Sequence, residues 1–125
     1  MTSNDPLSGE WYSGVGSRLV LAVNGSTLTG HFQSTDNPGA PAQPVYGSVN
    51  PDTSLPNRAL SFSVYWPKSS NFAAAVTSYT GQYQAKGGPS DTPQITSIFL
   101  LSTETEPKDN YKAVNVGFDI FERRK

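Results

Sequence analysis

The amino-acid sequence predicts an all-β fold, an eight-stranded antiparallel up-and-down β-barrel. Two observations lead to this prediction. The 125 residues contain 11 glycines and 10 prolines, which separate short runs of β-branched and aromatic residues. Eight such runs follow one another with short connections, and strands joined in this way favour a meander. A meander of eight strands can close into a barrel that holds one small ligand. A sandwich of two sheets is the alternative architecture.

The first half of the chain contains four of the predicted strands. The sequence Asn-Gly-Ser at 24–26 lies between two apolar runs and is a strong hairpin signal. Prolines and glycines in 35–43 and 51–57 interrupt regular backbone pairing, so these segments are predicted loops. The four strands are 10–15, 18–23, 27–34 and 44–50.

The second half contains the other four strands. The stretch 72–84 could form a helix through its three consecutive alanines. The positions of Thr77, Tyr79 and Tyr83 favour a strand instead, because these residues are strand formers spaced at a period of two. The four strands are 58–66, 72–84, 94–103 and 111–125, and the loops between the last three are 85–93 and 104–110.

The composition excludes several classes of function. The net charge is −1 and 15% of the residues are charged, so the chain lacks the basic face of a nucleic-acid-binding protein. The absence of cysteine excludes disulfides, thiolate nucleophiles and zinc–thiolate sites. The single histidine, His31, has no nucleophile motif beside it and is expected to be an exposed strand residue. We therefore expect neither an enzyme nor a bound metal or cofactor.

The length predicts one domain over residues 1–125. Residues 1–8 are expected to form a flexible N-terminal tail, and 123–125 a solvated basic C-terminal tail. The N-terminal segment lacks the apolar stretch of a signal peptide, and no run is long enough to span a membrane. We expect a cytoplasmic protein if the initiator methionine is native, and a secreted one if it replaces a removed leader.

The last strand carries the residue that first points to a function. In 111–125 (YKAVNVGFDIFERRK), Asp119 alternates in phase with Tyr111 and Gly117. If that side faces the lumen, a carboxylate lies inside the barrel. The same faces of the neighbouring strands would add rings and hydroxyls, including those of Trp66, Thr77, Tyr79 and Phe99. This mixture is typical of a small-molecule pocket.

The opposite side of the last strand is apolar. It carries Val114, Val116, Phe118 and Ile120, and the strand before it offers Ile98 and Leu100 on the same outer surface. A barrel wall that is apolar on its outside needs a covering surface, and the sequence offers no helix for this. We therefore predict a homo-oligomer with Val116 and Phe118 at the interface.

Five segments together resemble the avidin/streptavidin family of biotin-binding proteins. They are GEWYSGVGS (9–17), TLTGHF (27–32), TSYTGQY (77–83), FLLS (99–102) and VGFD (116–119), in the family's order. The short start and the PVYG segment are most similar to leaderless fungal members. The resemblance implies biotin in the open end of the barrel, assembly as a tetramer rather than a dimer, and a role in vitamin sequestration or defence.

The resemblance also implies which residues would contact biotin. Family members hold the ureido oxygen with an Asn, a Ser and a Tyr hydroxyl, and the matching positions here are Ser13, Ser17 and Phe32. Only Ser17 keeps the usual residue, and Phe32 cannot donate a hydrogen bond. The ureido nitrogens would donate to Asp119 and Ser34, both of which are retained.

The remaining contacts of the family are retained unevenly. Thr77 matches a threonine near the thioether sulfur, whereas Ala75 replaces a serine that holds the valeryl carboxylate. Four tryptophans usually form an aromatic box, and the positions here are Trp66, Tyr79, Phe99 and Tyr111. The last of these rings is lent to a neighbouring subunit in the family, and Tyr111 would take this part.

The predicted function is therefore a binding protein that holds biotin, as a ligand and not a cofactor, more weakly than typical family members. Each lost hydrogen bond costs roughly 1–3 kcal/mol, and each 1.4 kcal/mol is about tenfold in affinity. The alternative is a barrel that has lost biotin binding and recognises a glycan or another small metabolite. It is suggested by the joint change of several family positions, which are Phe32, Ala75, Tyr79, Phe99 and Tyr111.

Overall fold

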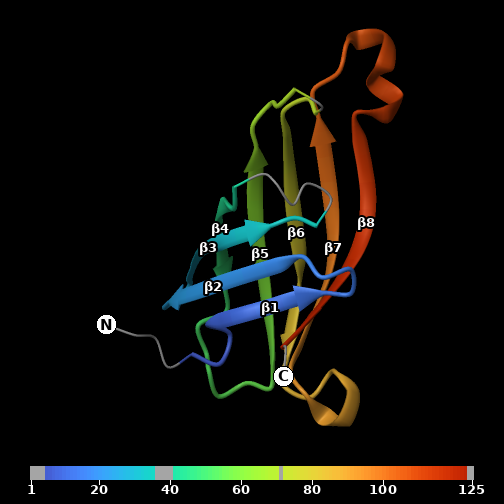
Figure 1. The fold of residues 1–125 in the computed structure, drawn as a ribbon. Helices are drawn as coiled ribbons and strands as arrows, with labels where there is room; N and C mark the ends of the chain where they lie inside the picture. The colour runs from blue at the N-terminus through green and yellow to red at the C-terminus, as the bar shows by residue number, and fades with distance from the viewer. Residues whose placement is uncertain (1–4, 36–40, 71, 124–125) are drawn as a thin grey trace.

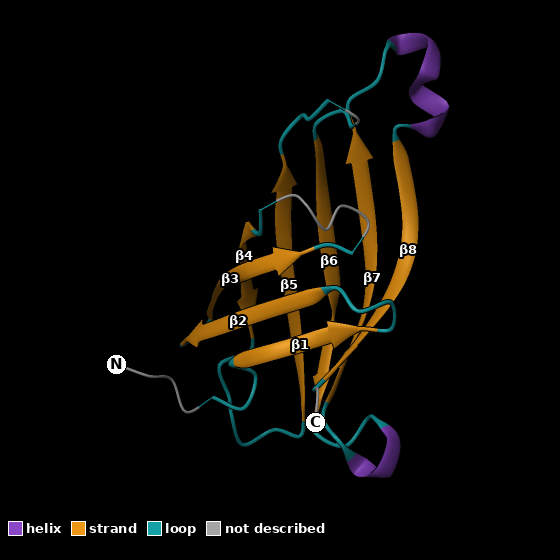
Figure 2. Cartoon of the chain, in the orientation of Figure 1, coloured by secondary structure: helices purple, strands orange, loops and turns teal. Residues whose placement is uncertain are grey.

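The eight predicted strands form a closed antiparallel barrel in simple chain order. The computed structural model describes residues 5–35, 41–70 and 72–123 (Figures 1 and 2). Each strand pairs with its neighbours in sequence, and the last strand pairs back on the first. The up-and-down barrel is confirmed, and the two-sheet sandwich is wrong. The strands are β1 Gly9–Ser13, β2 Arg18–Asn24, β3 Thr27–Gln33, β4 Gln43–Val49, β5 Asn57–Trp66, β6 Ala75–Gln84, β7 Gln94–Thr103 and β8 Val114–Glu122.

Two short 3-10 helices lie in the described residues, one inside the predicted loop 85–93 and one that begins in the predicted loop 104–110 and extends into the predicted strand 111–125. They are η1 Pro89–Asp91, between β6 and β7, and η2 Pro107–Lys112, between β7 and β8. Figure 1 shows η2 standing out beyond one end of the barrel and η1 lying at the opposite end. In the described part of the chain, no helix has the length and apolar character needed to cross a membrane.

The turn between β2 and β3 agrees with the prediction, whereas the start of β8 does not. The β2–β3 hairpin turns through Gly25, whose φ is 62°, as the Asn-Gly-Ser signal predicts. The last strand begins at Val114 and not at Tyr111, because Pro107 opens the η2 helix that contains Tyr111. The expected position of Tyr111 on the lumen face beside Asp119 is therefore wrong. Tyr111 is 82% exposed in η2.

Alternation along the strands fills one half of the lumen with apolar side chains. On β2 and β5, for example, every second residue is buried, as at Leu19, Leu21 and Val23 or at Leu60, Phe62 and Val64. At the closed end, Trp11 is fully buried and packs edge-on against Tyr83, with ring centroids 6.1 Å apart. The other half of the lumen is left open, and this half carries the cavity described below.

The described part of the predicted N-terminal tail, residues 5–8, is packed against the barrel and is not a free tail. Leu7 is fully buried, and its carbonyl oxygen accepts a hydrogen bond of 2.9 Å from Nε1 of Trp11. The hydroxyl of Ser8 accepts a hydrogen bond from the backbone N–H of Val23. Residues 1–4 lie outside the described residues.

Arg123 likewise departs from the predicted solvated C-terminal tail. Its guanidinium lies 3.9 Å from the ring centroid of Trp11 and donates to the backbone carbonyls of Glu10, Pro6 and Ser8. Burial lowers the pKa of Arg123. This side chain therefore clamps the start of the chain onto the barrel, while 124–125 lie outside the described residues.

An ion pair between Arg58 and Asp5 completes the closed end. The guanidinium donates two hydrogen bonds of 2.7 and 2.8 Å to the two carboxylate oxygens of Asp5, and its Nε donates to the carbonyl of Asn50. The side chains of Arg58 and Asp5 are 0% and 8% exposed. The hydrogen bond from Arg58 lowers the pKa of Asp5 below its ordinary value, and the same bond raises the pKa of Arg58.

Replacing Asp5 by Asn should destabilise the fold by about 3–5 kcal/mol, because it leaves the buried charge of Arg58 uncompensated. Urea unfolding at pH 7 measures this loss. Since the pKa of Asp5 is lowered, its contribution is present above the ordinary value of 3.8 and is lost as the pH falls through the folded-state pKa. The Asp5→Asn protein should therefore lose less stability than the wild type in that acid range.

The matched control is Glu10→Gln. Glu10 pairs with Arg18, but the side chains are 52% and 49% exposed, so the expected change is less than about 1 kcal/mol. If Asp5→Asn and Glu10→Gln unfold at the same urea concentration, the Asp5 ion pair does not hold the closed end.

Candidate functional site

The open end of the barrel encloses a cavity of about 570 Å³. Its lining residues come from β1, β3, β4, β5, β6, β7 and β8 and from the loops around the mouth. The lining includes ten of the eleven residues predicted from the sequence, which are Ser13, Ser17, Phe32, Ser34, Trp66, Ala75, Thr77, Tyr79, Phe99 and Asp119. The eleventh, Tyr111, lies in η2 and projects from the surface.

Strand alternation explains why most of these residues meet. On β6, the inward positions are Ala75, Thr77 and Tyr79. On β7 and β8, Phe99 and Asp119 occupy the equivalent side, and the hydroxyl of Ser97 donates a 2.9 Å hydrogen bond to the backbone carbonyl of Asp119. That bond fixes the β8 backbone at the carboxylate.

Packed aromatic rings form the floor of the cavity. Phe32 is only 3% exposed and lies between Tyr79, at a centroid distance of 5.9 Å, and Trp66, at 5.6 Å. Tyr79 stacks on Phe62 at 4.6 Å and touches Phe99 at 5.5 Å. The floor is therefore a continuous set of interacting rings, and Phe32 belongs to it.

Two serines of the cavity lining are joined by a tight turn. The backbone N–H of Ser13 donates to the carbonyl of Ser17 at 2.9 Å, and the N–H of Ser17 donates to the hydroxyl oxygen of Ser13 at 3.1 Å. Gly16 has a φ of 91°, a conformation that residues with a Cβ rarely adopt. The glycine therefore permits the turn that brings both serines to the cavity.

A similar hydrogen bond fixes Thr77. Nε1 of Trp66 donates to its hydroxyl oxygen at 3.0 Å. Thr77 and Ser13 thus both accept an N–H from the protein, and each hydroxyl retains its own proton for donation. The cavity therefore offers hydroxyl donors from Ser13 and Thr77 and a carboxylate acceptor from Asp119.

Several lining residues were not predicted as site residues. Leu101 and Thr103 continue the inward face of β7 beyond Phe99. The period of two predicts this side for Leu101, and the same period extends to Thr103. Lys68 and Phe72 belong to the loop between β5 and β6 and also line the mouth. Loops have no regular periodicity, so no comparable sequence pattern identifies these two residues. Within residues 5–35, 41–70 and 72–123, no group of three or more His, Cys, Asp or Glu side chains could hold a metal ion.

A family model described as the Avidin family matches residues 1–124. The chain belongs to the avidin family. The predicted family is thus confirmed over nearly the whole chain, and its members are binding proteins rather than enzymes. The cavity of this avidin-family barrel lies inside the open end, which is the place where the resemblance given above implies a ligand.

In this avidin-family barrel, Gly117 leaves room for the ring of Phe99, which lines the cavity. A methyl group at Gly117 would lie 2.0 Å from Cζ of Phe99, its partner across the β7–β8 pair. We expect Gly117→Ala to displace the Phe99 ring and to destabilise the fold by about 1–3 kcal/mol through overpacking. Urea unfolding and a crystal structure of the variant measure both effects.

The control is Gly14→Ala, because no atom lies within 4 Å of a methyl group placed there. Its free energy of unfolding should change by less than about 0.5 kcal/mol. A Gly117→Ala protein with wild-type stability and an unmoved Phe99 ring would contradict the packing described here.

Proposed function

We propose that this avidin-family chain binds biotin in the barrel cavity, as a ligand and not a cofactor, and more weakly than typical family members. One observation supports this most directly. Five residues that the resemblance assigns to biotin contact are retained and line a single cavity: Ser17, Ser34, Trp66, Thr77 and Asp119.

In this proposal the polar residues divide between the two sides of the ureido ring. The carboxylate of Asp119 and the hydroxyl of Ser34 accept the ureido N–H groups, and Ser13 and Ser17 donate to the ureido oxygen. Thr77 faces the thioether sulfur. Trp66, Tyr79 and Phe99 supply the apolar walls, whose burial adds affinity without direction.

Two residues argue for reduced affinity. Phe32 offers no hydroxyl to the ureido oxygen and is packed among rings in the floor. Ala75 lines the cavity but has no group that could hold the valeryl carboxylate. Each missing hydrogen bond costs roughly 1–3 kcal/mol in binding, or about tenfold for every 1.4 kcal/mol.

Isothermal titration should detect one biotin per chain. Phe32→Tyr should tighten binding by about tenfold, because it adds a donor facing the ureido oxygen. Asp119→Ala should weaken binding by more than about tenfold, because it removes a charged acceptor. Asp109→Asn is the control for loss of a carboxylate outside the cavity, since Asp109 lies in η2 beside Lys112, and it should bind like the wild type.

Absence of heat and of a thermal shift at millimolar biotin would remove this proposal. The alternative would then apply, in which the cavity takes a glycan or another small metabolite. The presence of Lys68, Gln33 and Gln43 in the lining favours a polar ligand in that case. A screen of sugars and metabolites by thermal shift tests it.

We also propose that the chain forms a homo-oligomer through the outer face of β5–β8, with a tetramer favoured over a dimer. This apolar outer face consists of exposed side chains on adjacent strands, which are Tyr65, Val76, Ile98, Leu100, Val114, Val116 and Phe118. Val116 and Phe118 are 71% and 62% exposed. So large an apolar surface is unusual for a monomer and typical of an interface.

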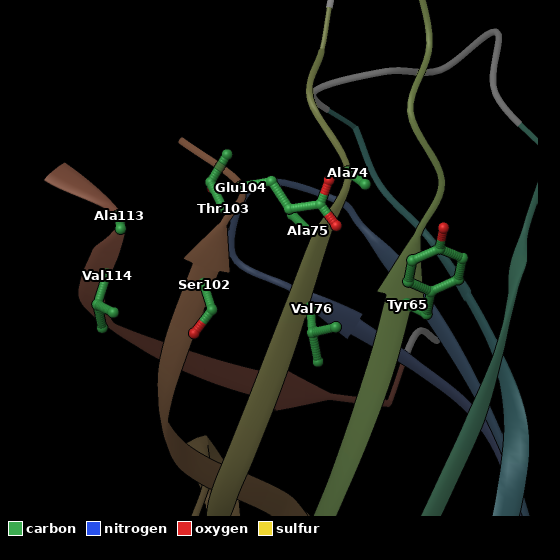
Figure 3. A pocket seen from close by; sticks show the side chains of 9 residues that line it. All are labelled: Tyr65, Ala74, Ala75, Val76, Ser102, Thr103, Glu104, Ala113 and Val114. Atoms are coloured by element: carbon green, nitrogen blue, oxygen red, sulfur yellow. The ribbon is translucent and has the colours of Figure 1, made fainter. Parts of the chain in front are cut away.

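A hollow of about 250 Å³ extends this face toward the mouth of the barrel (Figure 3). Tyr65, Val76, Ser102 and Val114 contribute to it from four neighbouring strands. The exposed ring of Tyr111, in η2 at the same end of the barrel, is available to a neighbouring copy, as the resemblance implies.

Charge on the apolar outer face should dissociate the oligomer. We expect Val116→Arg combined with Phe118→Arg to give monomers in sedimentation velocity, because buried unpaired charge strongly opposes association. His31→Arg is the control, since His31 is also exposed but lies on β3, and it should sediment like the wild type. A wild-type monomer at high micromolar concentration would contradict the proposed interface.

A further inference from the structure

The hydroxyl of Ser17 has a neighbour that lies outside the predicted site. Thr35 follows β3 and is exposed, whereas Ser17 is buried in the cavity lining. The backbone N–H of Thr35 donates to Oγ of Ser17 at 3.1 Å, and Oγ1 of Thr35 lies 3.0 Å from the same oxygen. Thr35 therefore contacts Ser17 twice, once through its backbone and once through its side chain.

The hydrogen-bonding capacity of a hydroxyl decides what these contacts mean. A serine hydroxyl can accept two hydrogen bonds and donate one. If Thr35 donates its hydroxyl proton, Ser17 accepts both the N–H and the O–H of Thr35, and its own proton must point elsewhere. The remaining direction is the cavity. In the opposite orientation Ser17 would give its proton to Thr35 and could offer none to a ligand.

We propose that Thr35 is a positioning residue that makes Ser17 a hydrogen-bond donor toward a carbonyl-type oxygen of the ligand. The proposal rests on the proposed function, in which that oxygen belongs to the ureido ring of biotin. Thr35 O–H donates to Ser17, and Ser17 O–H donates to the ligand. Donation to a hydroxyl strengthens the bond that the hydroxyl itself donates, so the chain of two bonds is cooperative.

The contact between Thr35 and Ser17 matters because the side of the cavity proposed to hold the ureido oxygen lacks the hydroxyl that Phe32 cannot supply. Phe32 supplies no hydroxyl there, so Ser13 and Ser17 are the donors that remain for the ligand oxygen. The strength of the donation from Ser17 depends on Thr35. Thr35 itself need not touch the ligand.

Thr35→Val tests the proposal, because it removes the hydroxyl but keeps the backbone N–H and the shape of the side chain. Biotin binding should weaken by about threefold to tenfold, the effect of one ordinary hydrogen bond. Thr35→Ser keeps a hydroxyl and should bind within about twofold of the wild type. In a Ser17→Ala background, Thr35→Val should have no further effect beyond about twofold, because its route to the ligand is gone.

A second ligand separates positioning from a general structural effect. In the analogue that carries sulfur in place of the ureido oxygen, the acceptor is weak. Thr35→Val should therefore lower the ratio of affinities for biotin and this analogue, whereas a distorted cavity would weaken both equally. The control Thr29→Val removes an exposed hydroxyl on β3, and it should alter neither affinity.

Amide hydrogen exchange of Thr35 in the ligand-free protein checks the contact itself. Exchange should be faster in Ser17→Ala than in the wild type, because the N–H loses its acceptor. Unchanged exchange overturns the proposal, and so does biotin binding by the wild type that Thr35→Val leaves intact. Failure of the wild type to bind biotin would instead overturn the proposed function, and the role of Thr35 with it.

Discussion

The pairing of β1 with β8, called the β1–β8 seam below, closes the barrel, and the site depends on it. Among the described residues, only Tyr12–Glu122 and Ser13–Phe121 pair across it, far fewer residue pairs than join β5 to β6 or β6 to β7. The seam removes the last free edges of the sheet, and it also brings the two ends of the chain together. Because Ser13 pairs with Phe121, Asp119, which comes two residues before Phe121 in β8, lies toward the mouth from Ser13. Barrel closure thus places the hydroxyl donors and the carboxylate acceptor in one cavity.

Contacts at the closed end of the barrel stabilise the short β1–β8 seam. Arg123 follows β8 and holds the carbonyls of residues that precede and begin β1, while Arg58 holds Asp5. Both cations are satisfied by acceptors from the start of the chain, so the first described residues contribute to the barrel itself. The ionic contacts lie at one end and the cavity at the other, and the apolar rings of Phe62, Tyr79 and Phe121 separate them.

The sequence could predict whatever depends on periodicity. A period of two placed Thr77, Tyr79, Phe99 and Asp119 on inward faces, because a closed barrel leaves a strand residue only two sides. Periodicity did not reveal that Tyr111 lies in a 3-10 helix, since that depends on Pro107 and on where strand pairing stops. It also did not reveal the ion pair of Asp5 with Arg58. These residues are 53 positions apart, and only the three-dimensional fold makes them neighbours.

The position of a hydroxyl oxygen does not by itself determine what it offers a ligand. Ser13, Ser17 and Thr77 each accept a hydrogen bond from an N–H of the protein, those of Ser17, Thr35 and Trp66 respectively. An oxygen that accepts one hydrogen bond still has its own proton, so each of the three hydroxyls can act as a donor. For Ser17 this holds when Thr35 donates its own O–H to Ser17. In the proposed complex, the ureido oxygen would then meet Ser13 and Ser17, and the ureido N–H groups would meet Asp119 and Ser34. The polarity of the cavity therefore follows from contacts behind its surface, which a comparison of lining residues alone would miss.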